Sequence, residues 1–364
     1  MKVSGIQIFW MMFTMEIGMT ILTTLTAPAQ VAKQDAWMSC ILASLIGLFV
    51  TFLAVKLSLL YPNQSMIEYS QAILGRWLGK IVVLPYFVMW LSVLPIILRQ
   101  SAEFVHLVLF NRTPLVVLVV LMLILVVYNT YLGGIESIAR CSEIFGPLVF
   151  VAVAGTLFLS LFHAHVINLL PVYADSGSFA IIKAAAQPAS FLGESIMLTM
   201  LTWLTREPRW TLAPALWGVG LAAFLVTSAM GLTLATFGPA ITANFPFPYF
   251  KMVRFISVMA FIQNIDAFVV MIWTLSIFIK LCLYLFISCY GISQWLGLKH
   301  WRRPIWVIVP TSLVGAMFPP NFDVSLVDYP EKVWIPYLAP TTMLAIPLLL
   351  WFIGAIRKAS KAKS

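Results

Sequence analysis

Charged residues are scarce in this chain. Asp, Glu, Lys and Arg make up 10% of its 364 residues, whereas they make up about a quarter of a typical soluble domain. Hydrophobic residues account for 62%, and the mean hydropathy is +0.98. Long hydrophilic stretches are also missing, which argues against a separate soluble domain or a linker. These features predict one all-α, polytopic membrane domain over residues 1–364, because a helix satisfies its backbone hydrogen bonds within the bilayer.

Cysteine is rare, and common motifs of soluble enzymes are absent. The four cysteines form no Cys-x-x-Cys pair, so we interpret them as packing residues. The sequence also has no phosphate-binding glycine-rich loop, no His-Glu-x-x-His zinc motif and no nucleophile elbow. We therefore predict that the protein is not an enzyme, uses no cofactor and binds no metal.

What the chain does have is a series of apolar runs that predicts about ten transmembrane helices. The predicted spans are residues 6–25, 37–60, 81–110, 114–132, 140–162, 181–204, 211–237, 265–290, 304–320 and 334–356. With the N-terminus inside, 14 of the 22 Lys and Arg residues lie on the inner side and 6 on the outer side. The positive-inside rule then predicts that both termini are cytoplasmic. The net charge of +9 is mostly a topology signal and does not indicate nucleic-acid binding, although a basic tail can be attracted to anionic membrane lipid.

Two spans, the first and the sixth, contain an acidic residue close to a glycine. Glu16 precedes Gly18 in the first span, and Gly193 precedes Glu194 in the sixth. A carboxylate in mid-membrane is costly and glycine weakens a helix, so we predict broken helices around a small-molecule site. The separation of five spans predicts two inverted repeats of five helices, over about residues 6–162 and 181–356.

The predicted ligand-binding residues all lie in these two breaks. They are Glu16, Gly18, Met19, Thr20, Ser190, Phe191, Leu192, Gly193 and Glu194. Unwinding would free backbone N–H groups that suit a carboxylate, and carbonyl, hydroxyl and acidic groups that suit an ammonium. An α-amino acid has both groups, although a sugar or a nucleoside would also accept polar partners. The alternative interpretation is that Gly18 and Gly193 only allow neighbouring helices to pack closely.

Four further ionisable residues, Arg99, Glu103, Asp266 and Lys280, fall in the third and eighth spans, which are equivalent in the predicted repeats. Arg99 and Glu103 are four residues apart and can pair, either to fix the third span or to line a ligand or ion pathway. Asp266 lies near the outer membrane end, where it can serve as a helix cap or a loop contact. Asp266 and Lys280 are roughly 20 Å apart along one helix, so they cannot pair with each other. Lys280 requires a carboxylate, carbonyls or water as its partner.

Several segments taken together resemble the B-subunit family of spore germination receptors. They are residues 33–37, 98–99 with Glu103, 112–114, 134–140, 168–172, 190–194 and 265–268. The resemblance runs in order along nearly the whole chain. It implies an inner-membrane protein of an endospore-forming bacterium, with the ten-helix, inverted-repeat fold of the amino acid–polyamine–organocation transporter superfamily (LeuT-like).

This resemblance also implies a function and partners. Members of the family sense nutrients such as amino acids, together with a larger A-type membrane subunit and a C-type lipoprotein subunit. Sodium-coupled transporters of related fold hold a cation between spans 1 and 8, and the ammonium of Lys280 could take its place. The leading hypothesis is therefore a nutrient sensor. The alternative is a stand-alone proton- or sodium-coupled amino-acid transporter, which would use the same pocket; a purely structural assembly subunit would need no acidic residues in both breaks.

Overall fold

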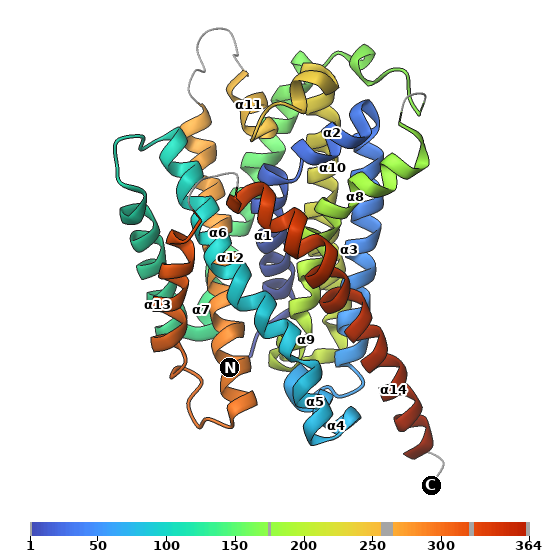
Figure 1. Cartoon of the computed structure of the whole chain (residues 1–364), viewed down its shortest axis with the longest axis vertical. Helices are drawn as coiled ribbons and strands as arrows, with labels where there is room; N and C mark the ends of the chain where they lie inside the picture. The colour runs from blue at the N-terminus through green and yellow to red at the C-terminus, as the bar shows by residue number, and fades with distance from the viewer. Residues whose placement is uncertain (1, 174–175, 256–264, 320–323, 362–364) are drawn as a thin grey trace.

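The computed structural model describes residues 2–173, 176–255, 265–319 and 324–361 (Figure 1). These residues form helices and no strands; one isolated backbone bridge joins Val3 and Thr205. The longer helices are α1 (Gly5–Thr23), α3 (Ala36–Ser58), α6 (Leu84–Val108), α7 (Leu115–Ser160), α10 (Leu212–Thr242), α12 (Ile265–Leu296), α13 (Ile305–Met317) and α14 (Ile346–Lys361). The shorter ones are α2 (Thr26–Ala32), α4 (Met66–Leu74), α5 (Arg76–Val82), α8 (Gly177–Leu192), α9 (Leu198–Leu201) and α11 (Pro248–Phe255).

Short 3₁₀ and π segments join these helices. The 3₁₀ segments are η1 (Lys33–Asp35), η2 (Leu161–His163), η3 (Val166–Leu169), η4 (Gly193–Met197), η5 (Thr202–Leu204) and η6 (Pro208–Trp210). The π segments are η7 (Val324–Asp328), η8 (Pro330–Leu338) and η9 (Pro340–Ala345). The prolines of η8 and η9 lack the N–H that a regular α-helix would need, and the wide turns lead directly into α14.

Seven helical segments among the described residues are long and apolar enough to cross a membrane. They confirm a multi-pass, all-helical membrane protein, while the count of ten spans and the inverted repeat remain predictions. The 46-residue α7 is too long for one crossing, and Gly134 interrupts it with φ 54° and ψ −145°. This kink falls between the predicted fourth and fifth spans.

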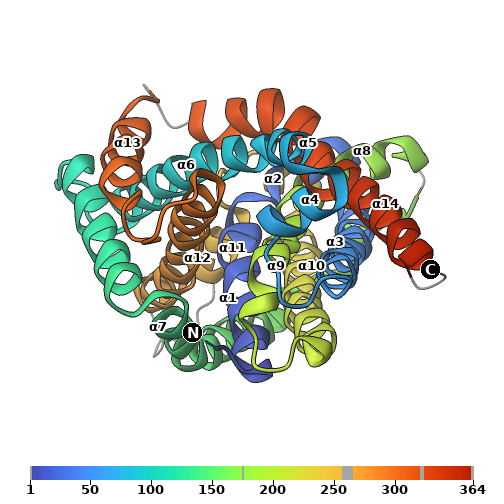
Figure 2. The same ribbon diagram turned by 90° about the horizontal axis from the view of Figure 1, so that it is seen from below.

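Helix α1 lies near the centre of the bundle (Figure 2) and packs against α7, α10 and α12. It begins with a capping box, in which the Ser4 side chain accepts from the Gln7 backbone N–H and the Gln7 side chain accepts from the Ser4 N–H. Every residue from Met11 to Thr23 is buried. From Met11 onward, α1 is therefore surrounded by other helices.

In the first span the helix is interrupted later in the chain than predicted. Helix α1 continues through Gly18 and ends at Thr23, and the chain turns at Thr24 and Leu25 before α2 begins. The prediction of an unwound backbone at Gly18 is therefore wrong. One glycine costs a helix only about 1 kcal/mol relative to alanine, so it does not by itself open the helix.

The sixth span does change its backbone at the expected glycine. Helix α8 ends at Leu192, and the 3₁₀ segment η4 begins at Gly193, followed by the short α9 and η5. The tighter turns of 3₁₀ geometry rotate successive side chains differently from an α-helix. They direct Glu194 and Ser195 toward α12 and α3, where both side chains have partners.

Candidate functional site

Three of the predicted residues meet in the interior of the bundle, although they come from three separate segments. Glu16 lies on α1, Glu194 on η4 and Lys280 on α12. All three side chains are buried to at least 98%, and the Lys280 Nζ lies 2.9 Å from the Glu194 Oε2. Lys280 was expected to need a carboxylate, carbonyls or water as its partner, and the structure supplies a carboxylate.

Glu16 is the exceptional member of this group. Its exposed fraction is 0%, yet neither carboxylate oxygen has a hydrogen-bond partner of good geometry among the described residues. Its electrostatic neighbours are Lys280, Glu194 and the backbone N–H of Ser195. If both carboxylates were ionised, the single ammonium of Lys280 would leave one buried negative charge uncompensated, which is costly in a medium of low dielectric constant.

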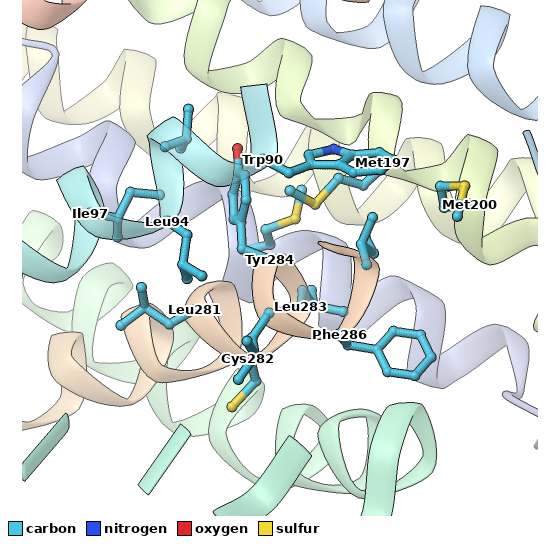
Figure 3. Packing of buried hydrophobic residues seen from close by; sticks show 14 of the residues in the cluster. Trp90, Leu94, Ile97, Met197, Met200, Leu281, Cys282, Leu283, Tyr284 and Phe286 are labelled. Atoms are coloured by element: carbon cyan, nitrogen blue, oxygen red, sulfur yellow. The ribbon is translucent and has the colours of Figure 1, made fainter. Parts of the chain in front are cut away.

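Two aromatic side chains complete the surroundings of the ion pair. The Tyr284 hydroxyl donates to Glu194 Oε2 over 2.7 Å, and the Lys280 Nζ lies 5.4 Å from the centroid of the Phe191 ring. Figure 3 shows Tyr284 projecting from α12 toward α6, the helix that carries Trp90 and Leu94. Sequence reasoning missed Tyr284. Its spacing of four residues from Lys280, which places both side chains on one helix face, was the available signal.

A small cavity lies directly beside Glu194. It is lined by Val93, Ile96, Ile97, Gln100, Phe191, Glu194, Tyr329, Pro330 and Trp334. The lining combines an apolar wall with the polar groups of Gln100, Glu194 and Tyr329. Its volume of about 20 Å³ holds roughly one water molecule, so in this conformation the cavity is too small for an amino acid.

The two glycines of the predicted breaks are both points of close helix packing. A Cβ at position 18 would collide with the Ser276 hydroxyl of α12 and lie 3.1 Å from the Ser276 Cβ. The Gly18 carbonyl also accepts from Trp273 Nε1, and the Ser276 hydroxyl donates to the Thr14 carbonyl. Gly193 instead faces the flexible thioether of Met343 in η9. The close-packing interpretation is therefore the one that the geometry of Gly18 supports.

The hydroxyl groups of the remaining predicted ligand residues are used in hydrogen bonds within their own helices, and the other side chains are apolar. The Thr20 hydroxyl donates to the Glu16 carbonyl within α1, and Met19 is part of the apolar core. The Ser190 hydroxyl donates to the Gln187 carbonyl over 2.7 Å, and the Leu192 side chain packs against Gly47 of α3. Because α1 is intact here, the N–H groups that were expected to bind a carboxylate are used within the helix.

Arg99 and Glu103 form a separate buried pair on α6, as their spacing predicts. The Arg99 Nε lies 2.6 Å from Glu103 Oε1, and its NH1 group donates to the Ala316 carbonyl over 3.1 Å. The guanidinium therefore joins α6 to the end of α13, which supports a role in fixing α6. Neither residue lines the cavity beside Glu194. Asp266 lies at the start of α12, but its side chain is outside the described residues, so its predicted role stays untested.

Comparison with solved structures shows the fold. MhsT in complex with L-phenylalanine matches with a TM-score of 0.67, 12% identity and coverage of 97% of this chain and 99% of that chain. A Na⁺-coupled sialic acid symporter in a substrate-bound, outward-open state matches with a TM-score of 0.63, 13% identity and coverage of 96% and 79%. At these identities the likeness establishes a shared transporter fold and no shared substrate.

Comparison with curated sequences identifies relatives of one kind. Spore germination protein KB of Bacillus subtilis is 23% identical, with 100% of this chain and 97% of the relative covered. YndE of the same organism is also 23% identical, over 92% of each chain, and GerQB of Bacillus cereus is 26% identical over 82% of each. A family model described as spore germination protein matches residues 2–323. The chain therefore belongs to the spore germination protein family.

Proposed function

We propose that this chain is the nutrient-sensing membrane subunit of a spore germination receptor, with a mid-membrane pocket around Glu16, Phe191, Glu194 and Lys280. The observation that carries the proposal is the buried group of two carboxylates and one ammonium. Charges of this kind within a membrane are expensive and mark ligand or ion sites. The ligand that best complements an excess negative charge is one that brings its own ammonium, and an amino acid does so.

Binding would act as a signal by changing a conformational equilibrium. A ligand shifts such an equilibrium only if it binds the two states differently. The segments that meet at Glu16, Glu194 and Lys280 come from α1, η4 and α12, so a bound ammonium would contact three elements at once. The proposed readers of this change are an A-type membrane subunit and a C-type lipoprotein subunit, in the spore inner membrane with both termini of this chain cytoplasmic.

The second candidate is a proton- or sodium-coupled amino-acid transporter that acts alone. The shared fold with a Na⁺-coupled symporter supports it, as does the Glu16 carboxylate, which could take up a proton. The pocket residues serve both functions equally. Only a measurement of movement across the membrane separates them.

The test combines equilibrium binding and uptake of radiolabelled amino acids in proteoliposomes that contain only this chain. Binding without uptake supports the sensor, and gradient-driven uptake supports the transporter. A matched ligand series tests the chemistry: the amino acid, the corresponding amine without the carboxylate, and the corresponding acid without the ammonium. We expect the amine to compete and the acid to fail; competition by the acid alone would overturn the proposed ammonium site.

A further inference from the structure

A groove on the rim of the bundle is distinct from the pocket described above. It runs between the first half of α7 and α13, which lie side by side at the edge of the bundle (Figures 1 and 2). Its walls are apolar throughout, and several large side chains are exposed in it, including Ile124, Tyr128 and Trp306 at 58%, 67% and 74%. The α7 wall extends from Val120 to Leu132, roughly 18 Å at 1.5 Å per residue. That length is close to one leaflet of a hydrocarbon core of about 30 Å.

One end of this groove opens into a strongly basic pocket. Lys299, His300, Arg302 and Arg303 line the pocket with Trp301, and it shares Tyr131 and Trp306 with the groove. No acidic residue lines it. Arg302 has a structural role, because its Nε donates to the Tyr131 carbonyl over 2.7 Å and its NH2 group to the Leu132 carbonyl over 3.3 Å. The side chains of Lys299, His300 and Arg303 are exposed.

The basic pocket lies on the side of the bundle that carries the N-terminus. The Lys2 backbone N–H donates to Glu136 Oε1 over 3.1 Å, just after the Gly134 kink of α7, and Arg302 holds the carbonyls just before that kink. Most basic residues of the chain are assigned to this side. A basic pocket between helices on such a side complements the phosphate of an anionic lipid, and a tryptophan at the junction fits the level of the headgroups.

We infer that the groove and the basic pocket together form a binding site for one anionic phospholipid. An acyl chain lies along Ile124, Tyr128 and Val309, and the phosphate is held by Lys299, His300 and Arg303. A transmembrane helix of a partner fits this surface less well. Helix interfaces in membranes favour small residues, whereas no Gly, Ala, Ser or Thr lines the groove.

The test uses brominated lipids, which quench tryptophan fluorescence on contact. The full chain is placed in nanodiscs that contain phosphatidylglycerol or phosphatidylcholine with brominated acyl chains. We expect stronger quenching by phosphatidylglycerol, and Trp306→Phe should remove most of this excess. The double variant Lys299→Ala/Arg303→Ala should lower the preference for phosphatidylglycerol roughly tenfold. The matched control Arg206→Ala/Arg209→Ala, which removes two exposed charges from the same side, should leave it unchanged.

Any one of four outcomes would overturn the inference. Equal quenching by the two lipids would show that the groove does not select the headgroup charge. A preference that inorganic phosphate abolishes at millimolar concentration would indicate a free-anion site. Exclusion of both lipids when an A-type partner is added would show that a protein covers the groove. If Lys299→Ala/Arg303→Ala unfolds, the variant Lys299→Gln/Arg303→Gln provides the same comparison, provided that its melting temperature is unchanged. If that variant still prefers phosphatidylglycerol, the result contradicts the proposed site.

Discussion

The two segments in which an acidic residue lies close to a glycine, at Gly18 and at Gly193, have similar sequences and different structures. At Gly193 the helix changes to 3₁₀ geometry, and Glu194 gains an ion pair with Lys280 and a hydrogen bond from Tyr284. At Gly18 the helix continues, and Glu16 remains buried without a hydrogen bond of good geometry from any residue that the structure describes. Glu194 is thus held by direct contacts, whereas Glu16 is not.

This difference shows which role each acid can have. A carboxylate with two good partners, as Glu194 is, joins two segments, η4 and α12, and removing it would leave Lys280 without its direct contact. A buried carboxylate that accepts no hydrogen bond of good geometry adds less support, and its desolvation weakens the folded state. Keeping one at the centre of a bundle is a cost that a bound cation or a proton would offset. The following predictions test the contrast between Glu16 and Glu194.

The largest effect is expected for Lys280→Met, which removes the one ammonium between the two carboxylates. Breaking a buried ion pair while leaving its partner charged costs about 3–5 kcal/mol. We expect a loss of this size in the free energy of unfolding in detergent, with lower abundance in the membrane. The control is Lys183→Met, which removes an exposed lysine of α8. Wild-type stability in Lys280→Met would show that water reaches the pair.

A matched pair of Glu→Gln variants should separate the two acids directly. Glu194→Gln loses the direct ion pair and the charged acceptor for Tyr284, so we expect a destabilisation of about 3 kcal/mol. Glu16→Gln removes an uncompensated charge and should be neutral or stabilising. Thermal unfolding of both variants, beside the exposed control Glu207→Gln, gives the comparison. Equal losses for Glu16 and Glu194 would remove the proposed distinction.

The two glycines should also differ. Gly18→Ala forces a methyl group against the short Ser276 side chain, which is held by the Thr14 carbonyl, and overpacking of this kind costs about 2 kcal/mol. Gly193→Ala meets a Met343 side chain that can rotate away, so the loss should stay below about 1 kcal/mol. Unfolding midpoints measured side by side test the order. A larger loss at Gly193 would mean that its backbone, and not the space beside it, requires glycine.

Of the two partners of Glu194, the smaller loss is expected for Tyr284→Phe, which keeps the ring and removes the hydroxyl. Losing one hydrogen bond to a carboxylate should lower the free energy of unfolding by about 1.5 kcal/mol. The ion pair itself stays intact, so the variant should still fold and bind. Tyr128→Phe on the lipid-facing rim is the control. No effect of Tyr284→Phe would place that hydroxyl outside the network.

Much of this arrangement follows from the sequence, and the rest depends on tertiary contacts. Hydropathy predicts the membrane helices, and i,i+4 spacing predicts the Arg99–Glu103 pair, because both depend on local geometry. That Lys280 needs a polar partner, which is a carboxylate in the structure, follows from the cost of a buried charge. The identity of that carboxylate depends on how η4 packs against α12, and the continuity of α1 through Gly18 depends on contacts with Trp273 and Ser276. The packing of η4 against α12 and the contacts of α1 with Trp273 and Ser276 join segments that are far apart in the chain, so the local sequence does not indicate them.

The central claim is that the uncompensated charge of Glu16 recruits an ammonium ligand. The direct test is equilibrium binding of radiolabelled amino acids to the reconstituted full chain, compared among the wild type, Glu16→Gln and the exposed control Glu207→Gln. We expect Glu16→Gln to lower the affinity at least tenfold while the protein remains folded, and Glu207→Gln to bind like the wild type. Wild-type affinity in a folded Glu16→Gln protein would contradict the claim.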